Sequence, residues 1–245
     1  MKTLARQALQ YWVARHYQKH DVSSWPAWAG NVLDVKIPQN IPIKTSPSSL
    51  GGANVNILLR MVDQTMPLVG DCAECGVFRG SSLLTLGLHL KQAGSTKRIY
   101  GFDSFAGFDD AVEYDLGLGG AGDIEKHHGG FSNTSLDYVR RRAHALGLGD
   151  IVLLRQGYFR DALPREPNRA YSFVHLDCDI YESYRDCLHY FYPRLTPGAV
   201  VLLDEYNDPP WPGCNKAVDE FLQQRPEKLV KIESDGYQKY YFVKN

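Results

Sequence analysis

Hydrophobic and polar positions along the chain alternate between two periods, which predict strands and helices in turn. Apolar runs typical of buried strands fall at 71–77, 97–105, 151–159, 171–179 and 198–206. Helical spacing falls between and after them, at 81–94, 135–149, 161–167, 181–195 and 213–225. Strands that alternate with helices in this way form a mostly parallel sheet covered on both faces. The pattern therefore predicts an α/β fold.

The two ends of the chain differ from this alternation. The last 17 or so residues contain two alternating runs around Asp235-Gly236, which predict a closing hairpin. The first 20 residues have helical spacing, and 21–54 hold four prolines and an SSLGG turn. We interpret 1–54 as a helix and an irregular arm on the substrate side, a lid, and 55–245 as the main domain, which starts with a helix at 55–66. A Gly-rich loop at 106–133 is long enough to be functional.

Composition and charge indicate a soluble globular protein and give no sign of a nucleic-acid or membrane partner. Of the 245 residues 44% are hydrophobic, which argues against disorder, and the formal net charge is −1 with acids and bases dispersed. No basic stripe indicates nucleic acid, and no polybasic cluster or long apolar segment indicates a membrane. The start lacks a signal peptide's apolar stretch and the five cysteines are odd in number, so we expect a cytoplasmic protein with reduced thiols.

Acidic side chains gather where two predicted strands end. Asp177 and Asp179 stand two positions apart in one run, and Asp204 and Glu205 end the next. Carboxylates at one point repel each other unless a cation, a proton or a positively charged ligand lies between them. Hard oxygen ligands favour Mg²⁺, so we predict a metal site there. Because 177 and 179 share one side of an extended strand, one can be a ligand and the other a base.

Structural interpretations of the same residues stay open at this point. The acids could simply cap the helices that follow them. His175 precedes Asp177 by two positions and could be a metal ligand, but a lone histidine in a strand is more often a core residue with its hydrogen bonds satisfied.

The first two predicted strands also end in acids. In AECGVFRGSS, Glu74 precedes Gly76, and Gly80 precedes a helix with an expected serine N-cap. An acid here suits a ligand with an ammonium or sulfonium centre, although an ordinary strand-to-helix turn has the same residues. Asp103 ends the second strand, where nucleotide-binding folds hold a ribose diol; a loop cap is the alternative. Together the two favour a ligand that carries adenosine.

Several of these segments resemble one family. AECGVFRGSS, YGFDSFAGF, QGYFRDALP, the stretch 175–206 and CNKAVDEF are similar to the macrocin O-methyltransferase family, whose members are S-adenosylmethionine- and Mg²⁺-dependent sugar O-methyltransferases of antibiotic biosynthesis. The resemblance covers about 50–225. It implies a class I methyltransferase fold: a Rossmann-like sheet of seven strands with the last strand antiparallel.

The resemblance also implies roles for particular residues. Asp177, Asp204 and Glu205 are expected to bind the metal, although the family usually has two aspartates where this chain has Asp204-Glu205. Asp179 is expected to be the catalytic base. The residues expected to contact S-adenosylmethionine are Glu74, Cys75, Gly76, Arg79, Ser81, Asp103, Ser104, Ser135, Gly157, Tyr158, Phe159 and Asp177.

We therefore expect an O-methyltransferase that acts on a hydroxyl of a sugar, as an antibiotic glycoside, a nucleotide sugar or a polysaccharide. Three alternatives remain: a catechol-type enzyme that acts on an aromatic diol or another small natural product, a nicotinamide dehydrogenase, and a catalytically silent binding protein on the same fold. The turn after the first predicted strand, AECGVFRGSS, is not a G-x-G-x-x-G motif, and this turn and the closing hairpin both argue against the dehydrogenase. The aromatic-rich arm predicts either a lid or a homodimer contact, and the sequence does not identify the acceptor.

Overall fold

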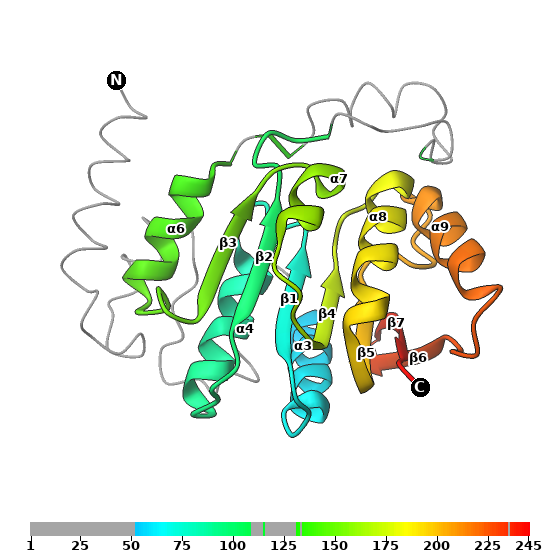
Figure 1. Cartoon of the computed structure of the whole chain (residues 1–245), viewed down its shortest axis with the longest axis horizontal. Helices are drawn as coiled ribbons and strands as arrows, with labels where there is room; N and C mark the ends of the chain where they lie inside the picture. The colour runs from blue at the N-terminus through cyan, green and yellow to red at the C-terminus, as the bar shows by residue number, and fades with distance from the viewer. Residues whose placement is uncertain (1–51, 109–114, 116–130, 133, 235) are drawn as a thin grey trace.

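The computed structural model of the chain describes residues 52–108, 115, 131–132, 134–234 and 236–245 (Figure 1). The predicted N-terminal helix and almost all of the arm, with the lid and homodimer contact predicted for them, lie outside these residues. Most of the Gly-rich loop at 106–133 lies outside them as well. The domain division at 54/55 therefore stays a prediction.

The regular elements follow the predicted order. The strands are β1 (Asp71–Cys75), β2 (Ile99–Asp103), β3 (Val152–Gln156), β4 (Tyr171–Leu176), β5 (Leu195–Leu203), β6 (Val230–Ser234) and β7 (Tyr237–Val243). The α-helices are α3 (Gly52–Thr65), α4 (Ser81–Gln92), α6 (Leu136–Ala145), α7 (Phe159–Ala162), α8 (Tyr181–Phe191) and α9 (Pro212–Leu222). Short 3₁₀ turns, η4 (Leu163–Arg165) and η5 (Tyr192–Arg194), follow α7 and α8.

The described strands form one sheet in the order β3-β2-β1-β4-β5-β7-β6. Strands β1 to β5 are parallel, and β7 runs antiparallel to both β5 and β6. The hairpin turns at Gly236, whose φ of +78° suits glycine. The predicted seven-stranded sheet with an antiparallel last strand is confirmed. Its strand order reverses between β1 and β4, and ligands of such sheets bind at the carboxyl ends there.

Helices cover both faces of the sheet, and each face has its own apolar core (Figure 1). On one face, α3, α4 and α6 contribute Leu58, Leu86 and Val139 to a buried cluster. On the other, α8 and α9 contribute Leu188 and Val218. Strands β1, β4 and β5 are buried on both sides, which explains their nearly continuous apolar runs.

Two local predictions differ from the structure. The N-cap of α4 is Gly80, with φ +81°, and not a serine; Ser81 is already helical. A Cβ on Gly80 would lie 2.8 Å from Val139 Cγ1, so close helix packing as well as the left-handed backbone favours glycine. Strand β4 ends at Leu176, so Asp177 and Asp179 follow the strand and do not alternate along it.

Candidate active site

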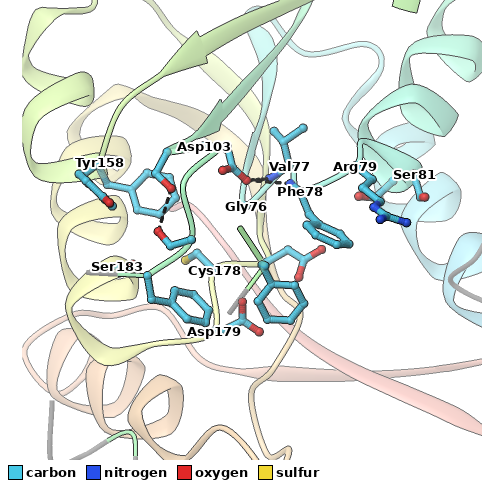
Figure 2. Close-up of a pocket in the computed structure, with 17 residues that line it drawn as sticks. Gly76, Val77, Phe78, Arg79, Ser81, Asp103, Tyr158, Cys178, Asp179 and Ser183 are labelled. Carbon is cyan, nitrogen blue, oxygen red and sulfur yellow. Dashed lines mark hydrogen bonds between the residues drawn. The ribbon is translucent and has the colours of Figure 1, made fainter. Parts of the chain in front are cut away.

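A cavity of about 210 Å³ opens at the carboxyl ends of β1, β2 and β4 (Figure 2). Eight of the predicted cofactor-contacting residues line it: Gly76, Arg79, Ser81, Asp103, Ser104, Tyr158, Phe159 and Asp177. The catalytic base predicted from the resemblance, Asp179, lines it as well. Residues from four separate loops thus meet where the fold places ligands. Four others, Glu74, Cys75, Ser135 and Gly157, are not part of its wall.

The loop after β1 is packed against the chain that follows β4. Gly76 has φ +91°, and a Cβ on it would lie 1.5 Å from the carbonyl oxygen of Asp177. Glycine is therefore required here because two segments of the chain pack closely against each other, and not only because a ligand approaches. The contact places the first loop of the cavity directly beside the acidic residues.

Asp103 joins two loops of the cavity. Its Oδ2 accepts hydrogen bonds from the backbone N–H groups of Val77 and Phe78, each at 2.7 Å (Figure 2). Its Oδ1 accepts one from Phe105 at 2.5 Å. Burial raises the pKa of Asp103, and these three donors oppose that rise. Asp103 thus caps the loop, as one interpretation held, and its half-buried carboxylate still faces the cavity.

Glu74 lies behind the cavity wall. Its side chain is fully buried; Oε1 accepts a hydrogen bond from Ser82 Oγ at 2.9 Å, and Oε2 lies 3.0 Å from His175 Nδ1. From the sequence we expected this acid to face a ligand with an ammonium or sulfonium centre. In the structure the group that it contacts is the imidazole of His175. Ser135, another predicted contact, is the N-cap of α6 and accepts a hydrogen bond from the Tyr138 N–H.

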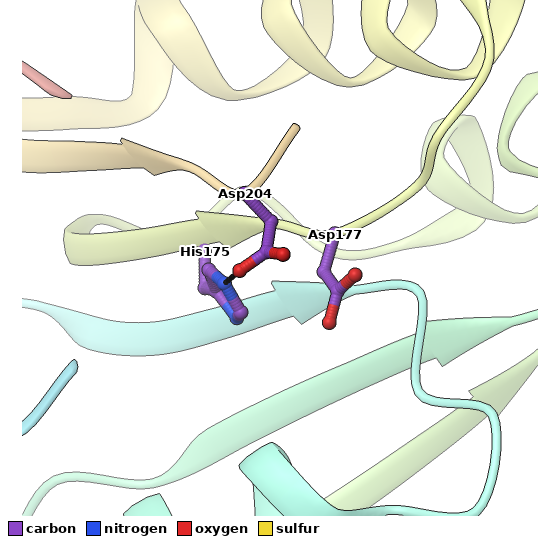
Figure 3. A group of neighbouring side chains, drawn as sticks. All are labelled: His175, Asp177 and Asp204. Atoms are coloured by element: carbon purple, nitrogen blue, oxygen red, sulfur yellow. Dashed lines mark hydrogen bonds and ion pairs between the residues drawn. The ribbon is translucent and has the colours of Figure 1, made fainter. Parts of the chain in front are cut away.

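The predicted acidic cluster forms at the ends of β4 and β5, which are neighbours (Figure 3). Ligand atoms of His175, Asp177 and Asp204 all lie within 4.8 Å of one another. Both ring nitrogens of His175 are engaged, because Nε2 lies 3.1 Å from Asp204 Oδ1 while Nδ1 contacts Glu74. Burial opposes the charged imidazole, but the bonds to Asp204 and Glu74 outweigh it and raise the pKa of His175 to about 10. His175 is thus a satisfied core residue.

Lys239 of β7 supplies a second cation to the cluster. Its Nζ pairs with Asp204 Oδ1 and also donates to the Asp204 carbonyl at 2.9 Å. The Lys239 side chain is only 2% exposed. Burial acts against ionisation of Asp204, but Lys239 and His175 hold the pKa of its carboxyl well below the ordinary range. Sequence reasoning missed Lys239; its one signal was a lysine at a central position of a predicted strand.

Asp177 and Asp179 have no such cationic partners within the described part of the chain. Among the described residues, no group donates a hydrogen bond to either carboxylate. Burial and the neighbouring Asp204 raise the pKa of Asp177 to about 7, and burial with Asp177 and Asp204 raises the pKa of Asp179 as well. These are the carboxylates that a bound cation or a proton would stabilise.

Glu205 is buried and turned toward α8. Its Oε2 lies 2.5 Å from Tyr184 Oη and accepts a hydrogen bond from the Asp179 N–H at 3.3 Å. Burial, together with Asp204 and Asp179, raises the pKa of Glu205. The group of candidate metal ligands found among the described residues does not include it. Direct ligation of a metal by Glu205 therefore remains a prediction. The contacts that the structure shows for this carboxylate are those to Tyr184 and to the Asp179 backbone.

Comparison with known proteins places the chain in a family. The family model described as macrocin-O-methyltransferase matches residues 50–241. The 8-demethyl-8-(2,3-dimethoxy-alpha-L-rhamnosyl)-tetracenomycin-C 4'-O-methyltransferase of Streptomyces olivaceus is 34% identical over 56% of this chain and 53% of its own, so the chain spans about half of that relative. The demethyldecarbamoylnovobiocin O-methyltransferase of Streptomyces niveus is 29% identical over 91% of this chain and 79% of its own.

Solved structures show the same fold. The O-methyltransferase NovP covers 100% of both chains with a TM-score of 0.68 at 23% identity, and the calicheamicin methyltransferase CalS11 has a TM-score of 0.68 at 21% identity over 94% of this chain and 91% of its own. An O-methyltransferase of Bacillus cereus, solved with SAH, has a TM-score of 0.55 at 19% identity over 91% of this chain and 100% of its own. In the part of the chain that the structure describes, no helix is long and apolar enough to cross a membrane. The family match and the class I methyltransferase architecture agree, and the chain is an O-methyltransferase that belongs to the macrocin O-methyltransferase family.

Proposed function

We propose that the chain transfers the methyl group of S-adenosylmethionine to a hydroxyl of a sugar, with Mg²⁺ bound at the acidic cluster and Asp179 as the base. The observation that carries the proposal is a pair of carboxylates, Asp177 and Asp179, on the wall of the cavity at the sheet's switch point, which accept no hydrogen bond from the described residues. The family match supports the chemistry, and the cavity supports its location.

The methyl donor is proposed to lie across the ends of β1 and β2. The Asp103 carboxylate faces the cavity beside Ser104 and is suited to the ribose diol. Arg79 and Ser81 line the cavity where α4 begins, so the amino-acid end is assigned there. Tyr158 and Phe159, at the start of α7, supply aromatic and backbone contacts for adenine.

The residues present fit a hard divalent cation. Both oxygens of Asp177 and the second oxygen of Asp204 accept no hydrogen bond within the described residues, and oxygen ligands suit Mg²⁺. His175 is a less suitable ligand, because its two ring nitrogens already contact the carboxylates of Glu74 and Asp204. Mg²⁺ bound there would lower the pKa of a hydroxyl in contact with it and orient that hydroxyl.

Asp179 is placed to take the acceptor's proton. It lines the same cavity as Asp103 and Asp177, and burial with its acidic neighbours raises the pKa of its carboxyl, which makes it a stronger base. Methyl transfer needs little more than alignment and the exclusion of water. The chain's own contribution is thus to hold three groups at one cavity: donor, hydroxyl and base.

The acceptor class is proposed from the relatives. The Streptomyces olivaceus and Micromonospora griseorubida enzymes are named for methylation of a rhamnosyl group and of mycinamicin III; the second is 28% identical over 76% of this chain and 75% of its own. A rhamnosyl group is therefore the first acceptor to test. An aromatic diol is the second candidate, because Phe78, Phe108 and Phe131 form an aromatic wall of the cavity.

The test measures methyl transfer from labelled S-adenosylmethionine to a rhamnosylated tetracenomycin, TDP-rhamnose and catechol. We expect a rhamnosyl acceptor to be methylated, EDTA to abolish the reaction and Mg²⁺ to restore it. Calorimetry should show that Asp177→Asn loses Mg²⁺ binding, whereas Asp179→Asn keeps it and loses roughly 10²–10⁴-fold in kcat. Full activity in EDTA would refute the metal, and near-normal turnover of Asp179→Asn would refute the base.

A further inference from the structure

The backbone of Asp179 adopts a conformation that few non-glycine residues adopt. Its φ is +61°, in the left-handed region. The next residue, Ile180, donates its N–H to the Cys178 carbonyl at 2.7 Å, which makes a very tight turn. Conformations of this kind persist where neighbouring groups hold them, and they occur often at functional sites. The question is which groups hold this one.

Two carboxyl groups from distant parts of the chain bind the backbone on either side of the turn. Glu205 Oε2, after β5, accepts the Asp179 N–H at 3.3 Å. Asp115 Oδ1, from the segment after β2, accepts the Tyr181 N–H at 2.7 Å. Both are buried. The Asp179 turn is thus held at both ends by side chains that come from outside its own segment.

Tyr184 in turn fixes Glu205. Its hydroxyl lies 2.5 Å from Glu205 Oε2 and 2.8 Å from the carbonyl oxygen of Leu176, the last residue of β4. The Glu205 N–H donates to the same hydroxyl at 3.4 Å. Because Tyr184 is fully buried in α8, one hydroxyl ties together the end of β4, Glu205 and α8. The carboxyl that holds the Asp179 turn is therefore itself rigidly placed.

We propose that Glu205, held by Tyr184, is a positioning residue that fixes the left-handed turn of Asp179 and so aims its carboxylate into the cavity. The inference rests on the proposed function, in which Asp179 is the base. It also explains why a glutamate suits this position. The extra methylene lets the side chain reach Tyr184 and the Asp179 backbone, while the neighbouring Asp204 faces His175 and Lys239.

Two substitutions separate positioning from metal ligation. Glu205→Gln keeps the length and an oxygen that can accept the Asp179 N–H, but it removes the charge that a metal ligand needs. Glu205→Asp keeps the charge but is too short to reach the turn. Positioning predicts that Gln preserves kcat within about threefold, and that Asp lowers kcat about 10- to 100-fold. Ligation predicts the opposite order.

Each variant is assayed with whichever of the three acceptors named above the wild-type enzyme methylates. Its Kd for Mg²⁺ and its Kd for S-adenosylmethionine are measured by calorimetry. We expect both Kd values to stay within about threefold of wild type in Glu205→Gln and Glu205→Asp. A loss of Mg²⁺ affinity in Glu205→Gln, with Glu205→Asp near normal, would overturn the proposal.

The turn itself can be observed without any ligand. Tyr184→Phe removes the hydroxyl that holds Glu205, so amide hydrogen exchange at 177–181 should become at least severalfold faster. Tyr171→Phe is the matched control, because the Tyr171 hydroxyl is buried in β4 and has no hydrogen-bond partner among the described residues. Equal exchange at 177–181 in the two variants would overturn the proposal.

A double-mutant cycle distinguishes failure of this inference from failure of the proposed function. If Glu205 acts through Asp179, Glu205→Ala should lower kcat about 10- to 100-fold in the wild-type background and by less than about threefold in Asp179→Asn. A full additional loss in the Asp179→Asn background would refute positioning while leaving Asp179 as the base. Near-normal kcat of Asp179→Asn would refute the base, and hydrogen exchange would still decide what holds the turn.

Discussion

Replacing Lys239 with methionine removes one of the two cations that contact the buried acids within the described residues. The acidic side chains at these strand ends are Glu74, Asp177, Asp179, Asp204 and Glu205, and the cations that contact them are His175 and Lys239. Methionine keeps most of the length and apolar volume of lysine, so the change mainly removes charge. It leaves the Asp204 carboxylate with His175 as its one cationic partner among the described residues.

The expected cost follows from burial of the pair. The Lys239 side chain is 2% exposed and that of Asp204 is 18% exposed. Breaking a buried ion pair from one side costs about 3–5 kcal/mol, because the remaining charge stays buried without compensation. Some solvent reaches Asp204, so we expect about 3 kcal/mol off the free energy of unfolding when metal is absent.

Mg²⁺ should offset part of this loss. The Lys239 ammonium partly neutralises the Asp204 carboxylate and repels a cation bound beside it. Its removal should therefore strengthen Mg²⁺ binding. A tenfold lower Kd stabilises the folded state by about 1.4 kcal/mol more at saturating metal. The prediction is thus specific in sign: Mg²⁺ stabilises the variant more than it stabilises the wild-type protein.

The assay is urea unfolding followed by circular dichroism, in EDTA and in saturating Mg²⁺. Lys97→Met is the control, because Lys97 is also buried but donates to two backbone carbonyls, of Leu68 and Gly70, and to the Ser172 hydroxyl. That variant should lose stability by the same amount in both conditions. A loss under about 1 kcal/mol for Lys239→Met in EDTA, or an equal effect of Mg²⁺ on both variants, would refute the reasoning.

Two further predictions concern the ligands. Asp103→Ala should weaken S-adenosylmethionine binding by about 1–3 kcal/mol, because charge-assisted hydrogen bonds to the ribose are lost; an unchanged Kd by calorimetry would remove Asp103 from the donor site. The affinity for Mg²⁺ should rise between pH 6 and pH 8, because the pKa of Asp177 near 7 in the metal-free protein means that protons compete with the metal below that pH. A Kd for Mg²⁺ that does not change with pH would show that Asp177 is not a ligand.

The sequence predicts the sheet well because its signals are local and strong. Buried parallel strands such as β4 are apolar throughout, and helices such as α8 have a clear polar face with Arg185 and Asp186. The same signals place Asp177 and Asp204 at neighbouring strand ends, since parallel strands all end at one edge. The α/β class and the place of the acidic cluster therefore follow from periodicity and strand ends, whereas the class I methyltransferase topology is implied by the family resemblance.

What the sequence does not predict depends on tertiary contacts. Lys239 meets Asp204 because β7 pairs with β5, a contact across 35 residues that no local pattern encodes. The left-handed φ of Asp179 has no sequence signature, because an aspartate adopts this conformation only where its surroundings hold it. In the sequence, Tyr184 is one more buried position of an amphipathic helix. The role of its hydroxyl depends on its contact with Glu205, which lies 21 residues away.

The carboxylates at these strand ends are unlike in their surroundings, and this difference indicates what each one does. Glu74 and Asp204 are neutralised inside the protein by His175 and Lys239, so removing a ligand leaves them stable. Among the described residues no cationic side chain contacts Asp177 or Asp179, and both line the cavity. A fold tolerates such buried acids at a cost in stability, and that cost falls when a cation or a proton arrives. We therefore expect the protein to stay folded in EDTA, with two carboxylates whose charge is compensated only when a cation or a proton binds.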